Sequence, residues 1–288
     1  GRGKMKFDNI LTRMIGTKYP IIQGAFGMPG TGDSRLAVPV SEAGGLGILT
    51  AISFKDPDMF QEDLRIAKSK TDKPIAVNFS ILHETKFVED YFDDFLKITL
   101  DEGVETVFTS AYTVSNIGKA VKDAGGTWIH KCATIRHALS IEKKGADAVV
   151  IVGLEGTGFK NPDQHTTLIN ITAGRKLIKI PIIAAGGIGD GRGFVAALAA
   201  GAAGVYMGTA FMATKEYQAK DKLKNKIINR DITDPEYIKK LHKIDHDVKP
   251  SFASGVVDSV LPIKEFIDKI IKEAEEVMDE FKKFGMLK

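Results

Sequence analysis

The chain of 288 residues has almost no cysteine, and Cys132 is the only one. An internal disulfide is therefore excluded, and so is a metal cluster held by several thiolates. Apolar runs of the length that a membrane helix needs, about 18 residues, are absent as well. Residues 1–9 lack the apolar core of a secretory signal, so we expect a protein of the cytoplasm without a membrane partner.

An excess of charge of one sign is also missing. The formal net charge is +3, from 40 Lys and Arg against 37 Asp and Glu. Basic and acidic residues are interleaved along the chain, and this pattern disfavours a nucleic-acid partner. Apolar residues make up 43% of the sequence, which is enough for a sizeable core in a folded globular protein.

Short apolar runs, each bounded by turn residues, recur as far as residue 209. They are rich in Val and Ile and mostly lack strict alternation, as is typical of strands buried on both faces of a parallel sheet. We predict strands over 19–24, 46–51, 73–79, 105–110, 126–131, 147–153, 180–187 and 203–209.

Helix-like segments alternate with these runs, most clearly at 33–44, 115–126, 134–146 and 191–204. Eight strand–helix repeats of regular length predict an α/β protein with a (β/α)8 or TIM barrel. A doubly wound parallel sheet is the alternative, but eight regular units fit a closed barrel better.

Charged amphipathic segments replace this pattern after Thr209. They predict helices over 215–230, 234–247 and 263–285, with a loop or lid at 249–262. No linker separates a second domain. We therefore expect a barrel unit over 10–214 and, packed on the same domain, a C-terminal helical extension or lid over 215–288.

Glycines follow the last two predicted strands, with Gly186 and Gly187 after the seventh and Gly208, next to Thr209, after the eighth. Glycine weakens a strand, so its position here suggests that a ligand approaches the backbone closely. Phosphate sites of (β/α)8 barrels often follow these two strands. Backbone N–H groups and the next helix N-terminus would suit an anion there. Two ordinary strand-to-helix turns are the alternative.

Other predicted strand ends carry polar or small groups. The first is followed by the glycine-rich stretch 24–33, and the sixth by 153–159. Asn78 ends the third strand, where its amide can bind a ligand or cap a turn. Lys131 ends the fifth, where it either places a cation near an electron-rich ring or reaches solvent.

In this order the strand ends resemble the nitronate monooxygenase family, formerly called 2-nitropropane dioxygenases. Relatives of that family include FMN-dependent enoyl-acyl carrier protein reductases and some NAD(P)H:quinone reductases. The resemblance runs from about Ile10 to Thr214 and more weakly through SFASG. The matching stretches are PIIQGAFGM, SEAGGLGIL, IAVNF, GADAVVIVGLEG, IPIIAAGGIGDGRG and GAAGVYMGTAF.

The resemblance implies a (β/α)8 barrel that holds FMN non-covalently. It assigns the phosphate to Gly186, Gly187, Gly208 and Thr209, with Gly158 nearby. It places the isoalloxazine ring over Gly24, Ala25 and Phe26, with Asn78 and Lys131 at the polar edge. Neighbouring residues in the same motifs complete the cofactor-binding set, namely Glu155, Ala185 and Met207.

One position departs from the family pattern. Most members carry Glu-Ala-Gly-Gly-His after the sixth strand, and the histidine is the usual catalytic base or substrate-positioning group. The stretch here runs from Glu155 to Phe159, so we predict that Phe159 faces the substrate but exchanges no proton. His165 is a candidate substitute base, although a surface or capping histidine is the alternative. Lys131 is the second catalytic candidate, since it can stabilise negative charge on a reduced ring.

These observations predict an FMN-dependent oxidoreductase resembling nitronate monooxygenase. It would act on a small-molecule substrate, with electrons from that substrate or from NAD(P)H. Two alternatives stay open, an NAD(P)H-dependent enoyl-thioester or quinone reductase and a flavin-binding protein without turnover. The histidines show no metal-ligand spacing, so we expect no metal, and assembly into a homo-oligomer stays open.

Overall fold

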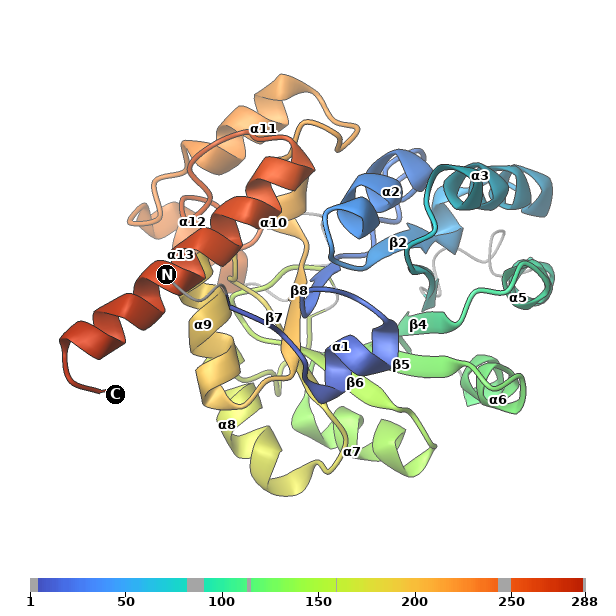
Figure 1. Ribbon diagram of the computed structural model, residues 1–288, viewed down its shortest axis with the longest axis horizontal. Coiled ribbons are helices and arrows are strands. Elements are labelled where there is room, and N and C mark those ends of the chain that lie inside the picture. Colours follow the sequence, from blue (N-terminus) through green and yellow to red (C-terminus); the bar gives the residue numbers. More distant parts are fainter. Residues whose placement is uncertain (1–4, 82–90, 113–114, 159, 243–249, 287–288) are drawn as a thin grey trace.

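Eight parallel strands form the centre of the computed structural model, which describes residues 5–81, 91–112, 115–158, 160–242 and 250–286. Neighbouring strands follow the order β1-β8-β7-β6-β5-β4-β3-β2, and helices surround them (Figure 1). The predicted (β/α)8 barrel is confirmed, and each predicted run contains one strand. The strands are β1 (Ile21–Gln23), β2 (Gly47–Thr50), β3 (Ile75–Ile81), β4 (Thr106–Ala111), β5 (Thr127–Cys132), β6 (Ala148–Val152), β7 (Ile182–Ala185) and β8 (Gly204–Met207).

The barrel closes between β1 and β2 through few backbone contacts. Ile22 and Leu46 form an isolated bridge there. The buried side chain of Gln23 extends this seam, because its Nε2 donates to Ile48 O (3.1 Å) and its Oε1 accepts from Ile48 N (3.2 Å). A side-chain amide thus takes the place of a peptide group in the ladder.

Helices of varied length follow the strands. Those predicted at 33–44, 115–126, 134–146 and 191–204 are present, whereas the helix predicted from residue 215 begins only at Asp221. The helices are α1 (Ile10–Ile15), α2 (Ser34–Glu42), α3 (Pro57–Lys70), α5 (Phe92–Asp101), α6 (Ser115–Asp123), α7 (Ile135–Lys143), α8 (Thr167–Leu177), α9 (Gly191–Ala200), α10 (Thr209–Met212), α11 (Asp221–Ile228), α12 (Pro235–His242) and α13 (Ile263–Lys283), with a 3-10 turn at Ala51–Ser53.

The long helix α13 packs against α9 and α2 and so occupies a place in the ring of helices (Figure 1). Its buried face includes Ile267, Ile270 and Ala274. The approach to α9 is close, because a Cβ on Gly191 would lie 2.3 Å from Glu273 Cβ. The division of the chain at residue 214 and the movement of a lid stay predictions.

Apolar side chains fill the inside of the barrel. Ile22, Ile48, Phe108, Ile129 and Val150 belong to this buried cluster. The barrel is therefore a packed core and not a channel, which leaves its ends as the places for a ligand. None of the helices in the described parts of the chain combines the length and the apolarity needed to cross a bilayer.

Candidate active site

A cavity of about 520 Å³ lies at the C-terminal ends of the strands. Most of the predicted cofactor-binding residues line it, and they come from the loops after β1, β6, β7 and β8 and from the end of β5. These lining residues are Gly24, Ala25, Phe26, Lys131, Gly158, Ala185, Gly186, Gly187, Met207, Gly208 and Thr209. The fold thus brings together segments that lie more than 180 residues apart in the chain.

The glycines after β7 and β8 form an open cradle of backbone. Gly186 and Gly187 have φ angles of 104° and 75°, in the left-handed region that glycine adopts readily. A Cβ on Gly208 would meet nothing within 4 Å. Among the described residues, no acceptor receives a hydrogen bond from the N–H groups of these three glycines. The cavity is therefore lined by three residues whose N–H groups have no acceptor in the described structure, an arrangement that suits an anion.

Thr209 adds a hydroxyl to this cradle. Its Oγ accepts a hydrogen bond from Ser251 N (2.8 Å), which leaves the hydroxyl proton for another acceptor. Ser251 also lines the cavity. The next residue, Phe252, donates from its N–H to Glu155 O (3.0 Å). The stretch 251–252 therefore connects the loops after β6 and β8, a role that only the weak SFASG resemblance could have suggested.

Glu155 does not line the cavity. Its carboxylate accepts hydrogen bonds from the N–H (2.8 Å) and the hydroxyl (3.0 Å) of Thr167, the first residue of α8. The side chain of the N-cap residue Thr166 makes no capping hydrogen bond, so Glu155 supplies the acceptor at this helix end. The Thr167 hydroxyl also lies 2.9 Å from Gly186 O. Glu155 thus fixes the loop after β6 against the glycine cradle.

A polar cluster on β3 and β4 lies beside Lys131. Asn78 is fully buried and is not among the residues that line the cavity, but its Nδ2 lies 3.2 Å from the hydroxyls of both Ser80 and Ser110. These two serines line the cavity, and Ser110 is the register partner of Lys131. Sequence reasoning selected Asn78 and missed the serines, although the alternation of a strand places residues 78 and 80 on one face.

Lys131 brings a cation to this cavity. Burial lowers the pKa of its ammonium group. No carboxylate in the described parts of the chain forms an ion pair with it. Its Nζ lies 5.7 Å from the centre of the Tyr206 ring, within the range of a cation–π contact. The cavity therefore offers a partly buried positive charge to a ligand with negative charge.

Tyr206 lies on β8 and was not selected from the sequence. It lines the cavity with only 6% of its surface exposed. Its hydroxyl oxygen accepts a hydrogen bond from Ala25 N (2.7 Å), which joins β8 to the loop after β1. Burial raises the pKa of the phenol well above its usual value, so the hydroxyl stays protonated at neutral pH.

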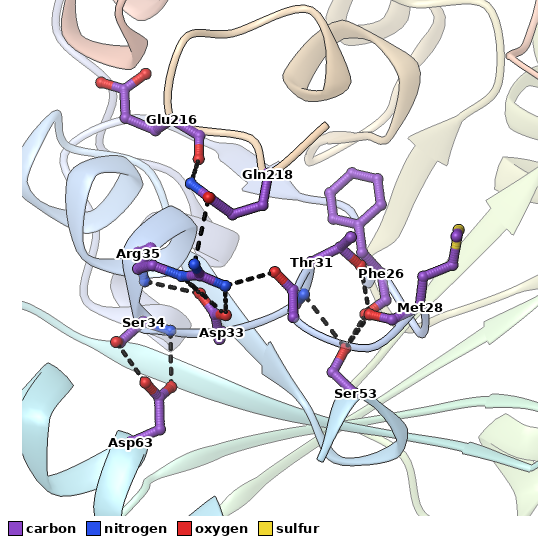
Figure 2. Close-up of polar contacts among 12 residues, drawn as sticks. Phe26, Met28, Thr31, Asp33, Ser34, Arg35, Ser53, Asp63, Glu216 and Gln218 are labelled. Carbon is purple, nitrogen blue, oxygen red and sulfur yellow. Dashed lines mark hydrogen bonds and ion pairs between the residues drawn. The ribbon is translucent and has the colours of Figure 1, made fainter. Parts of the chain in front are cut away.

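The loop after β1 is fixed by hydrogen bonds that Figure 2 shows. Ser53 Oγ donates to Phe26 O (2.5 Å) and accepts from Gly32 N (3.2 Å). Arg35 donates to Gly30 O (2.8 Å) and pairs with Asp33 at 2.6 Å. The loop is therefore held in place on the side of the cavity where Phe26 lies.

An apolar wall extends from this loop to residue 217. The rings of Phe26 and Tyr217 lie 4.8 Å apart, and both residues line the cavity. Met28, Ile52 and Met212 contribute further apolar lining. The cavity thus has a polar side, at the glycines and Lys131, and an apolar side.

Two predicted residues remain, His165 and Phe159. His165 is exposed and is not among the residues that line the cavity. Its backbone oxygen accepts from Leu154 N (2.9 Å), and this bond holds the loop after β6. Phe159 lies outside the described residues, although its neighbour Gly158 lines the cavity. Within the described ranges, no group of three His, Cys, Asp or Glu side chains could hold a metal ion.

Solved structures share this architecture. FabK from Thermotoga maritima is 29% identical, with a TM-score of 0.80, and the match covers 95% of this chain and 98% of that one. A nitroalkane oxidase from Streptomyces ansochromogenes is 22% identical, with a TM-score of 0.75 and coverage of 94% and 99%. At this identity the second likeness concerns the fold alone.

Curated relatives carry two kinds of name. A (3aS,4S,5R,7aS)-5-hydroxy-7a-methyl-1-oxo-octahydro-1H-indene-4-carboxyl-CoA dehydrogenase from Rhodococcus jostii is 32% identical over 83% of this chain. The chain spans only 64% of the length of that relative. A probable nitronate monooxygenase from Staphylococcus saprophyticus is 29% identical, over 80% of this chain and 75% of the relative.

The family model described as nitronate monooxygenase matches residues 8–242, which contain all eight strands and all the predicted site residues. Members of this family are oxidoreductases that use a flavin. The match covers most of the chain and agrees with both the fold and the curated relatives. The chain therefore belongs to the nitronate monooxygenase family.

Proposed function

We propose that this protein is an FMN-dependent oxidoreductase of the nitronate monooxygenase type, which acts on a small-molecule substrate in the cytoplasm. The observation that carries the proposal is the cradle of Gly186, Gly187 and Gly208, which line the cavity and whose N–H groups have no acceptor in the described structure. A phosphate monoester needs several donors of this kind and room for its oxygens. The absent Cβ of Gly208 leaves that room.

The residues present fit FMN. The three glycines and the Thr209 hydroxyl would hold the phosphate, and Gly24, Ala25 and Phe26 would lie against the ring. The volume of about 520 Å³ is in the range of ligand pockets in general. FMN supplies the redox chemistry when it is bound, and the protein orients it and provides electrostatic stabilisation. Lys131 would favour a ring that carries negative charge.

Phe159 governs the choice of substrate in this proposal. A phenylalanine cannot accept the carbon-bound proton of a neutral nitroalkane, whereas a nitronate has already lost that proton. We therefore propose that nitronates are oxidised in preference to nitroalkanes. The cavity lining contains Lys131 as its only titratable cation among the described residues, and its ammonium group would attract the anionic nitronate.

Reduction of an enoyl thioester or a quinone is the second candidate. The apolar wall of Phe26, Met28, Ile52 and Tyr217 favours it, because an acyl chain or a quinone ring needs an apolar surface. The names of the dehydrogenase that acts on a CoA thioester and of FabK are consistent with this class. In this case NAD(P)H supplies the electrons.

The test starts with purified protein reconstituted with FMN or FAD. We expect flavin absorbance after removal of free cofactor, and mass spectrometry of the released flavin should show FMN. Anaerobic mixing with NADH, NADPH and a nitronate then identifies the electron donor by bleaching of the flavin. Absence of bound flavin would refute the proposal, and a bound flavin that no donor bleaches would indicate a binding protein without turnover.

Gly208→Val tests the phosphate site directly. The new side chain enters free space, and the φ angle of −97° is accessible to any residue, so the fold should tolerate it. We expect the Kd for FMN to rise by more than about tenfold, which corresponds to at least about 1.4 kcal/mol. Gly208→Ala should give a smaller rise, and the melting temperature of the apoprotein should stay close to that of the wild type.

Gly187 is the less suitable position for this test. A Cβ there would lie 2.9 Å from Glu155 Cβ, and the φ angle of 75° disfavours other residues. Substitution at Gly187 would therefore destabilise the fold as well as the site. Unchanged FMN affinity in Gly208→Val would show that the phosphate lies elsewhere.

A further inference from the structure

We propose that Tyr206 is a further binding residue, whose hydroxyl donates a hydrogen bond to an acceptor atom on the ring of the bound cofactor. The inference rests on the proposed function, since it concerns the same cavity. It goes beyond it, because neither the sequence motifs nor the phosphate cradle assigns a role to Tyr206.

The Tyr206 side chain lies where a ring bound in the cavity could contact it. Tyr206 comes from the upper end of β8, and it lines the cavity one residue before Met207 and two before Gly208. Its ring contacts Phe108 at 6.1 Å between centroids, which restricts its orientation. Its hydroxyl lies 2.7 Å from Ala25 N, in the loop that the proposal places against the flavin ring.

The Tyr206 hydroxyl has a hydrogen-bond donor that the described structure does not use. A tyrosine hydroxyl has one proton to donate and can also accept. Tyr206 uses its acceptor capacity for Ala25 N–H, and no described residue accepts its proton. Buried polar groups almost always find a partner, so this proton requires an acceptor from a ligand or from water. Because Tyr206 lines the cavity, a bound ring with carbonyl oxygens and ring nitrogens would provide that acceptor.

Lys131 strengthens this donor. Its ammonium group lies 5.7 Å from the centre of the Tyr206 ring. A cation over an aromatic face withdraws electron density from the ring, so the O–H bond becomes more polar. In this proposal Lys131 would supply charge to the bound ligand, and Tyr206 would supply a directed hydrogen bond.

Tyr206→Phe tests the inference, because it removes the hydroxyl and keeps the ring under Lys131. Tyr19→Phe is the matched control. Tyr19 is also buried (8% exposed) and also has a lysine over its ring, with Lys18 Nζ at 4.8 Å, but it precedes β1 and does not line the cavity. For each protein we would measure the Kd for FMN, the absorption spectrum of bound FMN, and the urea-unfolding midpoint of the apoprotein.

We expect Tyr206→Phe to raise the Kd for FMN by about 5- to 20-fold, as for a lost buried hydrogen bond, and to shift the absorption bands of the bound flavin. Tyr19→Phe should change neither. A Kd within about twofold of the wild type, or a weaker Kd with unchanged bands and a matching loss of apoprotein stability, would overturn the inference. Failure of the wild type to bind FMN would instead refute the proposed function, so the two failures are distinguishable.

Discussion

We predict that the buried His130 makes the free energy of unfolding of this protein decrease in acid. Its ring is fully buried on β5, and its Nδ1 lies 2.7 Å from the Thr109 hydroxyl. Trp128 Nε1 donates to the same hydroxyl at 2.8 Å, and the described structure gives the Thr109 proton no acceptor other than His130 Nδ1, so we assign that proton to Nδ1. The imidazole is therefore neutral with its proton on Nε2, an atom for which the described structure offers no partner.

Burial, with smaller contributions from His137 and Lys131, lowers the pKa of His130 to about 3. The pKa of histidine in the unfolded chain is about 6.5. Below that pH the unfolded state binds a proton at this histidine, whereas the folded state keeps it neutral. Stability should fall from about pH 6.5 downward, until the folded form also titrates near pH 3. At pH 5 the loss attributable to this one group is about 2 kcal/mol.

Urea unfolding at pH 7 and pH 5 measures this loss. His130→Gln cannot titrate, and its amide oxygen can still accept from Thr109, so its change in unfolding free energy between the two pH values should be smaller than that of the wild type by about 2 kcal/mol. His165→Gln, at an exposed position, is the matched control and should follow the wild type. An equal loss in the wild type and in His130→Gln would refute the reasoning.

Three further predictions concern the cavity and the loops beside it. Ser53→Ala removes the hydroxyl that donates to Phe26 O and accepts from Gly32 N, so urea unfolding should show a free energy of unfolding lower by about 1–2 kcal/mol. A change within about 0.3 kcal/mol would contradict the role of Ser53 in holding the loop. Phe159→His should raise turnover of neutral nitroalkanes in an oxygen-consumption assay, because it adds a base. His165→Ala should leave the turnover of neutral nitroalkanes nearly unchanged, because the side chain is exposed and His165 is not among the residues that line the cavity. A loss of about 100-fold would instead assign His165 as the substitute base.

The strands were predictable from the sequence because burial on both faces requires continuous apolar runs, such as Ala148–Val152 and Ile182–Ala185. Helix α8 was harder to predict, since Leu168 and Ile169 are apolar yet exposed and obscure its buried face. The helix predicted from residue 215 was placed too early, because the charge pattern of 215–220 is helical although those residues are irregular.

Side-chain direction limited the prediction of the site. Glycine needs no side-chain direction to be interpreted, so Gly186, Gly187 and Gly208 could be selected from the sequence, and the fold places all three in the cavity lining. Tyr206 lies within an apolar run, where a tyrosine is most simply interpreted as core. Glu155 matched a family motif, but only the fold shows that its carboxylate turns away from the cavity to Thr167.

The Gln23 amide has a consequence for how the barrel opens. Elsewhere strands are joined by ladders of several register pairs, as between β3 and β4, whereas the β1–β2 seam depends on one bridge and one side chain. Local opening occurs first where the fewest interactions must be broken. We therefore expect β1 and β2 to separate transiently before any other pair of neighbouring strands. The loop that lines the cavity continues from β1, and backbone amide hydrogens at the seam, such as that of Ile48, would exchange with solvent whenever that edge separates.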